Sequence, residues 1–165
     1  ACTGWSGCLN GTQTRTGTCA GDCATVPKPA ESQTCTVTPP PTTMTASASV
    51  NNVPAELVKI TDGSASTFWM AGVSMAAGQW VQVDYGTIAS RSSVSFDIAP
   101  GYLNSYPRTF DVQVSTNGPS WTTVKAGAIG AYPTCTATFT AATIRFSRIV
   151  VQTGNPNWLA IAAWR

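Results

Sequence analysis

The sequence contains no histidine among its 165 residues, and this absence removes several chemistries. Without imidazole there is no Ser-His-Asp triad, no histidine metal ligand and no histidine proton shuttle. Charge is scarce as well, because Asp, Glu, Lys and Arg make up 10% of the residues, against roughly 25% in an ordinary globular domain. The basic residues form no cluster of the kind that displaces counterions from phosphates. Nucleic acid and anionic membranes are therefore not expected as partners.

Long hydrophobic runs are also missing. The longest, at 158–164, falls well short of the roughly 18 apolar residues that a transmembrane helix needs. Membrane insertion is therefore not expected. Hydrophobic residues nevertheless make up 43% of the chain, which is typical of a folded protein rather than a disordered one.

The cysteines are present but unevenly placed. Of the 6 cysteines, all but one lie in the first part of the chain, at positions 2, 8, 19, 23 and 35, and Cys135 stands alone. This clustering predicts a small disulfide-rich domain followed by a larger one that is held by its own hydrophobic core. Zinc binding is a poorer explanation, since paired Cys-x-x-Cys spacing and histidine are both missing. Disulfides form in oxidising compartments, so we expect a secreted protein, extracellular or at the cell surface, whose signal peptide was removed before Ala1.

The composition divides the chain into three parts. Residues 1–35 form the cysteine-rich part, and residues 36–43 form a Pro/Thr linker whose consecutive prolines favour an extended polyproline II strut. From 44 to 165, short alternating runs are separated by Gly, Pro and Asn about every 8 to 12 residues, which is typical of an all-β sandwich or barrel. A hairpin is predicted where the turn Asn117-Gly118 follows a strand at 109–115. The other expected strands span 80–85, 93–98, 121–124, 136–140, 143–151 and 158–164.

The cysteine-rich part contains a recognisable pattern. Trp5-Ser-Gly-Cys8, the run from Gly11 to Arg15, and Glu31-Ser-Gln-Thr-Cys35 together resemble a shortened thrombospondin type-1 repeat. The resemblance implies a thin ribbon of three strands, in which Trp5 stacks on Arg15 in place of a hydrophobic core. It also implies two disulfides, Cys8–Cys35 and Cys19–Cys23.

Two cysteines, Cys2 and Cys135, have no partner in that pattern. One hypothesis is a disulfide between them, which would clamp the small domain against the larger one. The alternative is that Cys2 pairs locally and that Cys135 is a buried free thiol.

The larger part contains four motifs in a characteristic order. They are Thr61 to Trp69, Gly78 to Gly86, Phe110 to Gly118 followed by Trp121, and Arg145 to Ile149. They resemble the discoidin-like, coagulation factor V/VIII C-type domain, whose fold is shared with family 32 carbohydrate-binding modules. The resemblance implies an eight-stranded jelly-roll sandwich with loops at one end that bind sugars, lipid head groups or protein ligands.

Catalysis is not expected from the acidic residues of the larger part, although glycoside hydrolysis needs only two facing carboxylates. Asp62 lies in an Asp-Gly turn, and Asp84 and Asp97 end strands where they could pair with Arg148. Glu56 and Asp111 complete the acidic inventory, and Asp111 points out of its strand. Serine nucleophiles lack an imidazole base, and no Gly-x-Ser-x-Gly elbow occurs. We therefore expect a protein that is not an enzyme.

A structural calcium ion is the one cofactor that the resemblance suggests. Asp62, Ser64 and Thr67 match the cluster near the Asp-Gly turn that relatives often use. The C-terminal Glu of those relatives is absent, since Ala162 and Ala163 stand there. Because calcium prefers six to eight hard oxygens, this would be a weak site of low charge. The alternative is that Asp62 caps its own turn.

A ligand site is expected on loops that carry aromatic rings and polar donors, where the apolar face of a sugar can stack. The segment 100–108 links two strands and carries Tyr102, Asn104, Tyr106 and Arg108. The alternative is that Tyr106 and Pro107 plug the end of the sandwich and that Arg108 is solvated.

A second loop, 154–158, could approach the same rim, with Asn157 as a donor and Trp158 as a platform, although Trp158 is also a candidate core residue. The segment 70–75 is expected to be a third, apolar loop. Trp69, Trp80 and Trp121 are expected to be structural.

These observations favour a secreted, non-catalytic carbohydrate-binding and adhesion module that recognises surface glycans through loop aromatic and polar residues. The alternative is a structural or self-assembling subunit of an extracellular matrix or surface appendage, with protein partners or copies of itself. Low charge favours that alternative because it leaves little self-repulsion.

Overall fold

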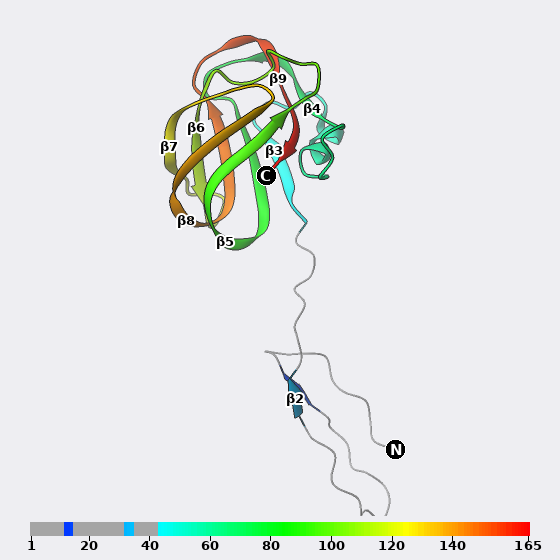
Figure 1. The fold of residues 1–165 in the computed structure, drawn as a ribbon, viewed down its shortest axis with the longest axis vertical. Helices are drawn as coiled ribbons and strands as arrows, with labels where there is room; N and C mark the ends of the chain where they lie inside the picture. Colours follow the sequence, from blue (N-terminus) through cyan, green and yellow to red (C-terminus); the bar gives the residue numbers. More distant parts are fainter. Residues whose placement is uncertain (1–11, 15–31, 35–42) are drawn as a thin grey trace, which may run out of the picture. The chain divides into compact units, whose positions relative to one another are not determined.

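The computed structural model describes residues 12–14, 32–34 and 43–165 (Figure 1). The chain divides into two compact units, Ala1–Pro41 and Thr42–Arg165. In the first unit, β1 (Thr12–Thr14) pairs antiparallel with β2 (Ser32–Thr34), with Gln13 opposite Gln33. Apart from these two short strands, the predicted thrombospondin-like motif lies outside the described residues, as do the five N-terminal cysteines and most of the predicted linker.

The second unit is an all-β sandwich of antiparallel strands. Its described residues form seven strands rather than the eight predicted. The structure contains β3 (Thr45–Ala48), β4 (Trp69–Met75), β5 (Trp80–Ile98), β6 (Thr109–Ser115), β7 (Thr122–Ile129), β8 (Thr134–Val151) and β9 (Asn155–Trp164), with a 3-10 helix η1 (Pro54–Ile60) before β4. The hydrogen-bonded order is β4-β9-β5-β8-β6-β7, and β3 pairs with β5. No helix among the described residues is long and apolar enough to cross a bilayer.

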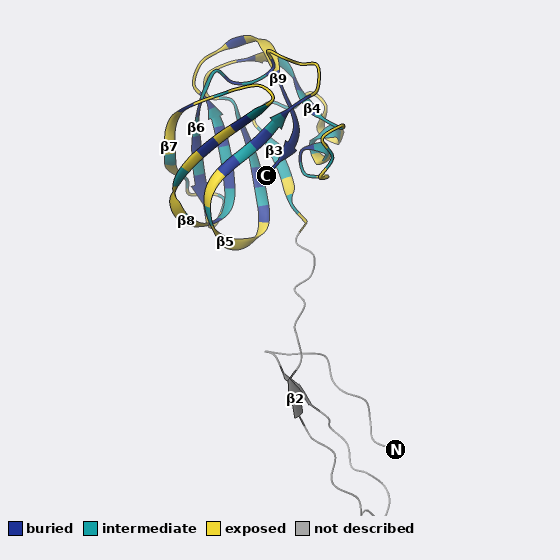
Figure 2. Cartoon of the chain, in the orientation of Figure 1, coloured by how far each residue is buried: buried dark blue, intermediate teal, exposed yellow. Residues whose placement is uncertain are grey.

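Two strands, β5 and β8, are long enough to serve both layers of the sandwich. The first half of β5 pairs with β3 and with the second half of β8, and its second half pairs with the first half of β8 and with β9. The prediction of separate strands at 80–85 and 93–98, and at 136–140 and 143–151, is therefore wrong. Residues 86–90 are exposed and interrupt the alternation (Figure 2), but the pairing with β8 continues across two register shifts.

The two register shifts have a direct effect on which side chains are buried. Before them, the odd-numbered Val81, Val83 and Tyr85 are buried, and after them the even-numbered Val94 and Phe96 are buried. Irregularities of this kind can change the phase of the alternation along a strand. Both halves of β5 therefore send their apolar side chains into the same core, although they belong to different layers.

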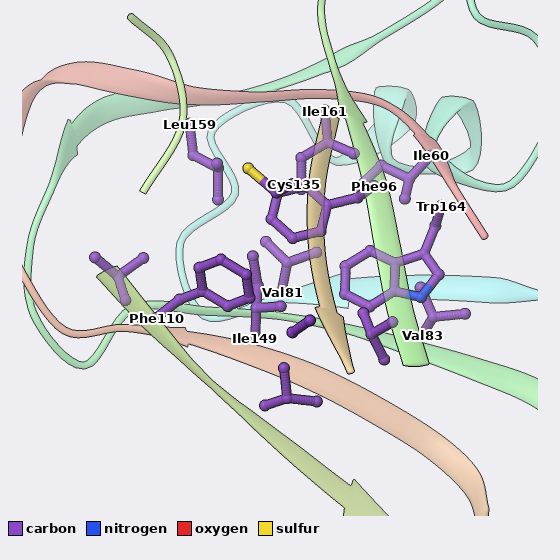
Figure 3. Packing of buried hydrophobic residues seen from close by; sticks show 14 of the residues in the cluster. Ile60, Val81, Val83, Phe96, Phe110, Cys135, Ile149, Leu159, Ile161 and Trp164 are labelled. Carbon is purple, nitrogen blue, oxygen red and sulfur yellow. The ribbon is translucent and has the colours of Figure 1, made fainter. Parts of the chain in front are cut away.

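Aromatic rings dominate the centre of the core (Figure 3). Phe96 stacks on Trp164 with ring centroids 5.5 Å apart, and it meets Phe110 edge-on at 5.5 Å. The Trp164 indole N–H donates to the Tyr85 hydroxyl at 3.0 Å, and that hydroxyl lies 2.8 Å from the Ser147 hydroxyl. The buried indole N–H of Trp164 thus has a partner, which removes the cost of burying it.

Cys135 is a free thiol in the structure and has no exposed surface. Its sulfur donates to the Ala131 carbonyl at 3.3 Å, and burial raises the pKa of the thiol to about 11. The predicted clamp, a disulfide to Cys2, stays a prediction, because Cys2 lies outside the described residues. Cys135 is buried because it pairs with Phe96 where β5 ends and β8 begins, and its side chain enters the core there.

Candidate functional site

An open hollow of about 350 Å³ lies at one end of the sandwich. Its wall comes from three segments that are far apart in the sequence, which are β4, the loop between β5 and β6, and the start of β9. The lining residues are Met70, Tyr102, Ser105, Pro156, Asn157 and Trp158. The structure thus brings three of the predicted ligand-binding residues, Tyr102, Asn157 and Trp158, to one place.

The loop at 99–108 is held against β9 by main-chain hydrogen bonds. The Ala99 N–H donates to the Ala160 carbonyl at 3.2 Å, and the Ala160 N–H donates to the Ser105 carbonyl at 3.1 Å. Within the loop, the Tyr102 N–H bonds the Ala99 carbonyl and the Ser105 N–H bonds the Tyr102 carbonyl. Two tight turns therefore lie between two attachments to the same strand, which places the Tyr102 side chain at the hollow.

The side chain of Asn155 ties the loop at 99–108 to the segment at 155–158. Its Nδ2 group donates to the carbonyls of Asn104 at 3.2 Å and Tyr106 at 3.4 Å. Its Oδ1 atom accepts hydrogen bonds from the main-chain N–H and the Nδ2 group of Asn157, both at 2.9 Å. Asn155 is buried, so these bonds satisfy polar groups that water does not reach. Sequence reasoning missed Asn155, because only the fold shows that its amide bridges two loops.

The two aromatic rings of the hollow are well exposed. Trp158 exposes 45% of its surface and Tyr102 exposes 38%, while the Tyr102 ring also contacts Phe68 with centroids 5.3 Å apart. Trp158 is therefore not a core residue, which settles the alternative that the sequence left open. Met70, which also lines the hollow, lies on β4 rather than on the apolar loop predicted at 70–75.

Three predicted ligand-binding residues, Asn104, Tyr106 and Arg108, do not line the hollow. The Arg108 Nη2 group donates to Asn104 Oδ1 at 3.1 Å, and its guanidinium carbon lies 4.1 Å from the centroid of the Tyr106 ring. Tyr106 is half-buried and packs against the core. These residues therefore contact one another within the loop, and the packing of Tyr106 agrees with the alternative that Tyr106 plugs the end of the sandwich. A direct role of the three in binding stays a prediction.

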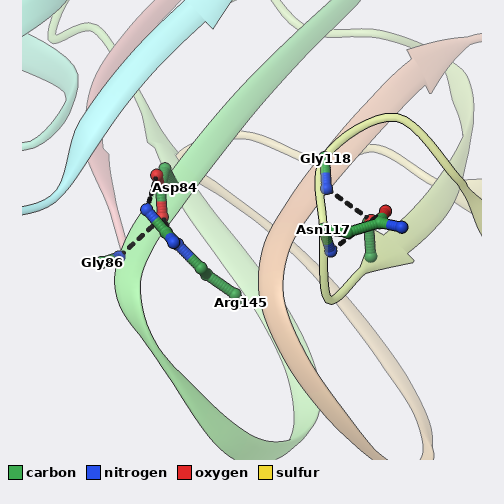
Figure 4. A network of polar contacts seen from close by, with 6 residues as sticks. Asp84, Gly86, Asn117, Gly118 and Arg145 are labelled. Atoms are coloured by element: carbon green, nitrogen blue, oxygen red, sulfur yellow. Dashed lines mark hydrogen bonds and ion pairs between the residues drawn. The ribbon is translucent and has the colours of Figure 1, made fainter.

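Asp84 forms its ion pair with Arg145, which differs from expectation (Figure 4). Both Asp84 oxygens accept hydrogen bonds from Arg145 at 2.9 Å, and Oδ1 also accepts the Gly86 N–H at 2.7 Å. The hydrogen bonds from Arg145 hold the pKa of Asp84 below its ordinary value. The expected pairing of Asp84 with Arg148 is wrong, because the register places Asp84 opposite Phe146.

Arg148 lies instead between aromatic rings on the outer face of the sheet. Its Nε group donates to Gln113 Oε1 at 2.7 Å. Its guanidinium carbon lies 4.2 Å from the Trp121 ring centroid and 5.9 Å from that of Trp80. Partial burial lowers the pKa of Arg148, and no carboxylate bonds it among residues 43–165. The expected pairing of Asp97 with Arg148 is wrong as well, since Asp97 bonds Arg165 and the Thr134 hydroxyl.

The carboxylates of residues 43–165 are all engaged away from the hollow. Glu56 pairs with Lys59 at 2.7 Å, and Asp111 accepts the Gly127 N–H at 2.8 Å. Asp62 is hydrogen-bonded in the turn after η1, and Asp84 and Asp97, which lie on β5, pair with Arg145 and Arg165. No two of these groups face each other across the hollow, so the described site has no carboxylate pair for glycoside hydrolysis.

The predicted calcium ligands Asp62, Ser64 and Thr67 form a self-contained turn. Asp62 Oδ1 accepts the Ser64 N–H at 2.8 Å, and Oδ2 accepts the Thr67 hydroxyl at 2.6 Å. These hydrogen bonds, that of Thr67 first, lower the pKa of Asp62. Within the described part of the chain, no three His, Cys, Asp or Glu residues lie close enough to hold a metal ion. One carboxylate whose oxygens already accept two hydrogen bonds does not fit a calcium ion.

A further hollow of about 320 Å³ lies beside the turn between β6 and β7, and no aromatic residue lines it. Its lining residues are Val114, Ser115, Thr116, Asn117, Ser120, Thr122, Val124, Ala142 and Thr143. The hollow with Trp158 and Tyr102 is therefore the candidate site.

Comparison with known proteins identifies relatives of the larger unit. The family model described as "F5/8 type C domain" matches residues 43–164, which confirms the resemblance seen in the sequence. No curated protein matches the chain.

Several solved structures share the fold. CpGH89CBM32-5 from Clostridium perfringens, in complex with GalNAc-β-1,3-galactose, is 14% identical with a TM-score of 0.64, over 74% of this chain and 93% of that chain. Chitosan-binding module 2 from a chitosanase/glucanase of Paenibacillus sp. IK-5, in complex with chitotriose, is 24% identical with a TM-score of 0.62, over 76% and 96%. The CBM32 of AlyQ, in complex with 4,5-unsaturated mannuronic acid, is 24% identical with a TM-score of 0.57, over 72% and 90%.

Proposed function

The chain belongs to the F5/8 type C domain family, and on that premise we propose that its larger unit is a carbohydrate-binding module without catalytic activity. The binding site is the hollow between β4, the 99–108 loop and the start of β9. The observation that carries the proposal is the pair of exposed rings, Trp158 and Tyr102, in an open hollow that also holds the Asn157 amide.

The lining of the hollow supplies both kinds of contact that a sugar needs. The C–H face of a pyranose packs against an indole, and the Trp158 ring offers such a surface. Sugar hydroxyls need neutral donors and acceptors, which Tyr102, Ser105 and Asn157 provide. Since one face of the hollow is open, single-site affinity should be in the roughly micromolar to millimolar range.

The solved structures that share the fold support the proposal of carbohydrate binding by analogy. Their complexes contain GalNAc-β-1,3-galactose, chitotriose and an unsaturated mannuronic acid. The larger unit covers 90% or more of each of these modules, so it has the extent of a whole module. The absence of catalysis is supported by the carboxylates of residues 43–165, each of which is engaged outside the hollow.

Secretion and a role in adhesion to surface glycans are part of the proposal. They are supported by the cysteine pattern of residues 1–35, by its resemblance to a thrombospondin type-1 repeat and by the implied disulfides Cys8–Cys35 and Cys19–Cys23.

A second candidate function is a self-assembling structural subunit. It is favoured by the low content of charge, 10%, and by exposed apolar side chains such as Ile129 and Val58. Light scattering of the purified chain without sugar distinguishes the two candidates, because only the structural subunit forms ordered polymers.

The carbohydrate proposal is tested by a glycan array, followed by calorimetric titration of the best neutral glycan. Trp158→Ala should abolish measurable binding, while Ile129→Ala, which also truncates an exposed apolar side chain but lies outside the hollow, should leave it unchanged. Binding that survives Trp158→Ala would place the sugar elsewhere.

A further inference from the structure

We propose that the hollow selects uncharged sugars over both uronic acids and amino sugars. The inference rests on the proposed function and adds the charge class of the ligand. The fold does not set this property, because modules of the same fold are seen with chitotriose, whose amines are cationic, and with a mannuronic acid, which is anionic. The side chains of the hollow must decide it.

Those side chains are neutral. Met70, Pro156 and Trp158 present apolar surface, and Tyr102, Ser105 and Asn157 present uncharged polar groups. One N–H of the Asn157 Nδ2 group donates to Asn155 at 2.9 Å, which leaves its second N–H as a donor and its Oδ1 atom as an acceptor for ligand hydroxyls. Every polar group of the lining can therefore be matched by a hydroxyl or an N-acetyl group of a neutral sugar.

No charged side chain of residues 43–165 lines the hollow. Arg108, the cation of the 99–108 loop, is bonded to Asn104 and stacked on Tyr106, and it does not line the hollow. Glu56, Asp84 and Asp97 each form an ion pair with a neighbouring Lys or Arg, and Asp62 and Asp111 are bonded within their own turns. Within residues 43–165, neither a cation for a uronate nor an anion for an ammonium lines the wall of the site.

A charged sugar loses water when it enters such a site and gains no counter-charge. Burying an ionised group without a partner is costly, whereas neutral hydroxyls regain hydrogen bonds from neutral partners. The hollow is open on one side, so part of the charge stays hydrated. We therefore expect discrimination of roughly ten-fold or more in affinity.

The test uses matched sets of monosaccharides titrated calorimetrically against the whole chain. The sets are galactose with galacturonic acid and galactosamine, glucose with glucuronic acid and glucosamine, and mannose with mannuronic acid and mannosamine. In the set that binds, the neutral member should bind about ten-fold more tightly than both charged members. A charged member that binds as tightly as its neutral counterpart overturns the charge selection and leaves the proposed function standing. Failure of every set and of the glycan array overturns both.

A pair of variants tests the physical cause. Met70→Glu introduces a carboxylate into the wall of the hollow, and Met70→Gln is a neutral side chain of the same length. Met70→Glu should raise the affinity for the amino sugar relative to its neutral counterpart by several-fold, while Met70→Gln should not. If Met70→Glu and Met70→Gln show the same preference between the amino sugar and its neutral counterpart, the neutral wall is not the cause of the discrimination.

Discussion

The side-chain amide of Asn155 donates a hydrogen bond to the main-chain carbonyl of Asn104 at 3.2 Å. The same amide reaches the Tyr106 carbonyl, and its oxygen holds Asn157. One buried side chain therefore joins the two loops that form the hollow. We therefore expect the shape of the candidate site to depend on this link.

Asn155→Ala should lower both stability and affinity. The variant leaves the carbonyls of Asn104 and Tyr106 without a partner, which costs about 1–3 kcal/mol of unfolding free energy. The loops lose their mutual support, so sugar binding should weaken as well. Denaturant unfolding and calorimetric titration measure the two effects.

Asn157→Ala is the matched comparison, because Asn157 lines the hollow and is more exposed than Asn155. It should weaken binding while changing stability by no more than about 0.5 kcal/mol. If the two asparagine variants behave alike, Asn155 has no special positioning role.

Arg108→Ala should leave sugar binding within about two-fold of the parent protein, while Tyr102→Ala should weaken it roughly ten-fold or more. The reason is that Tyr102 lines the hollow, whereas Arg108 stacks on Tyr106 and does not line it. Titration of the same glycan against both variants checks this. A large loss in Arg108→Ala would restore the direct role that the sequence predicted for this residue.

Stability should fall in acid through the Asp84–Arg145 pair. Because the pKa of Asp84 is lowered in the folded state, the pair stabilises the protein fully above the ordinary carboxyl value of 3.8, and this contribution is lost as the pH falls below it. Both side chains are partly exposed, so the contribution is at most about 1 kcal/mol. Asp84→Asn should therefore show a shallower decline in unfolding free energy between neutral pH and acid. The remaining slope includes Asp62, whose pKa is also lowered, and an unchanged slope in Asp84→Asn would contradict the prediction.

Cys135 should react with a thiol reagent only when the protein unfolds. Its thiol is fully buried and its pKa is raised to about 11, so little thiolate is present or accessible at neutral pH. The tryptic peptide 126–145 contains Cys135 as its one cysteine, and its alkylation can be followed by mass spectrometry. Labelling in guanidinium without a reductant is expected. If labelling required a reductant, Cys135 would be in a disulfide after all.

Calcium should have no effect on the melting temperature. An ion that binds the folded state raises that temperature by mass action. The Asp62 turn is already closed by Ser64 and Thr67, so added calcium and excess EDTA should give the same unfolding curve. A calcium-dependent shift that disappears in Asp62→Asn would show that the turn holds the ion.

The strands of the larger unit were predictable where the alternation of apolar and polar residues is regular. The prediction of β6 and of its hairpin partner after Asn117-Gly118 is confirmed, and Gly118 has a φ of +88° in the turn. The bend of β5 was not predictable, because residues 86–90 lack alternation and read as a loop. Their pairing partners on β8 are supplied from more than fifty residues away along the chain, as the register of Ala89 with Ile144 shows.

The sequence by itself determined the all-β class of the larger unit, its family and its lack of histidine chemistry, because alternation, turn residues and composition are local properties. It also placed aromatic and amide side chains in the right loops. Only the tertiary structure decided that Met70, Tyr102 and Trp158 share one hollow, that Arg108 stacks on Tyr106 outside its lining, and that Asn155 links its walls. These relations depend on strand order and register, which join segments that no local pattern connects.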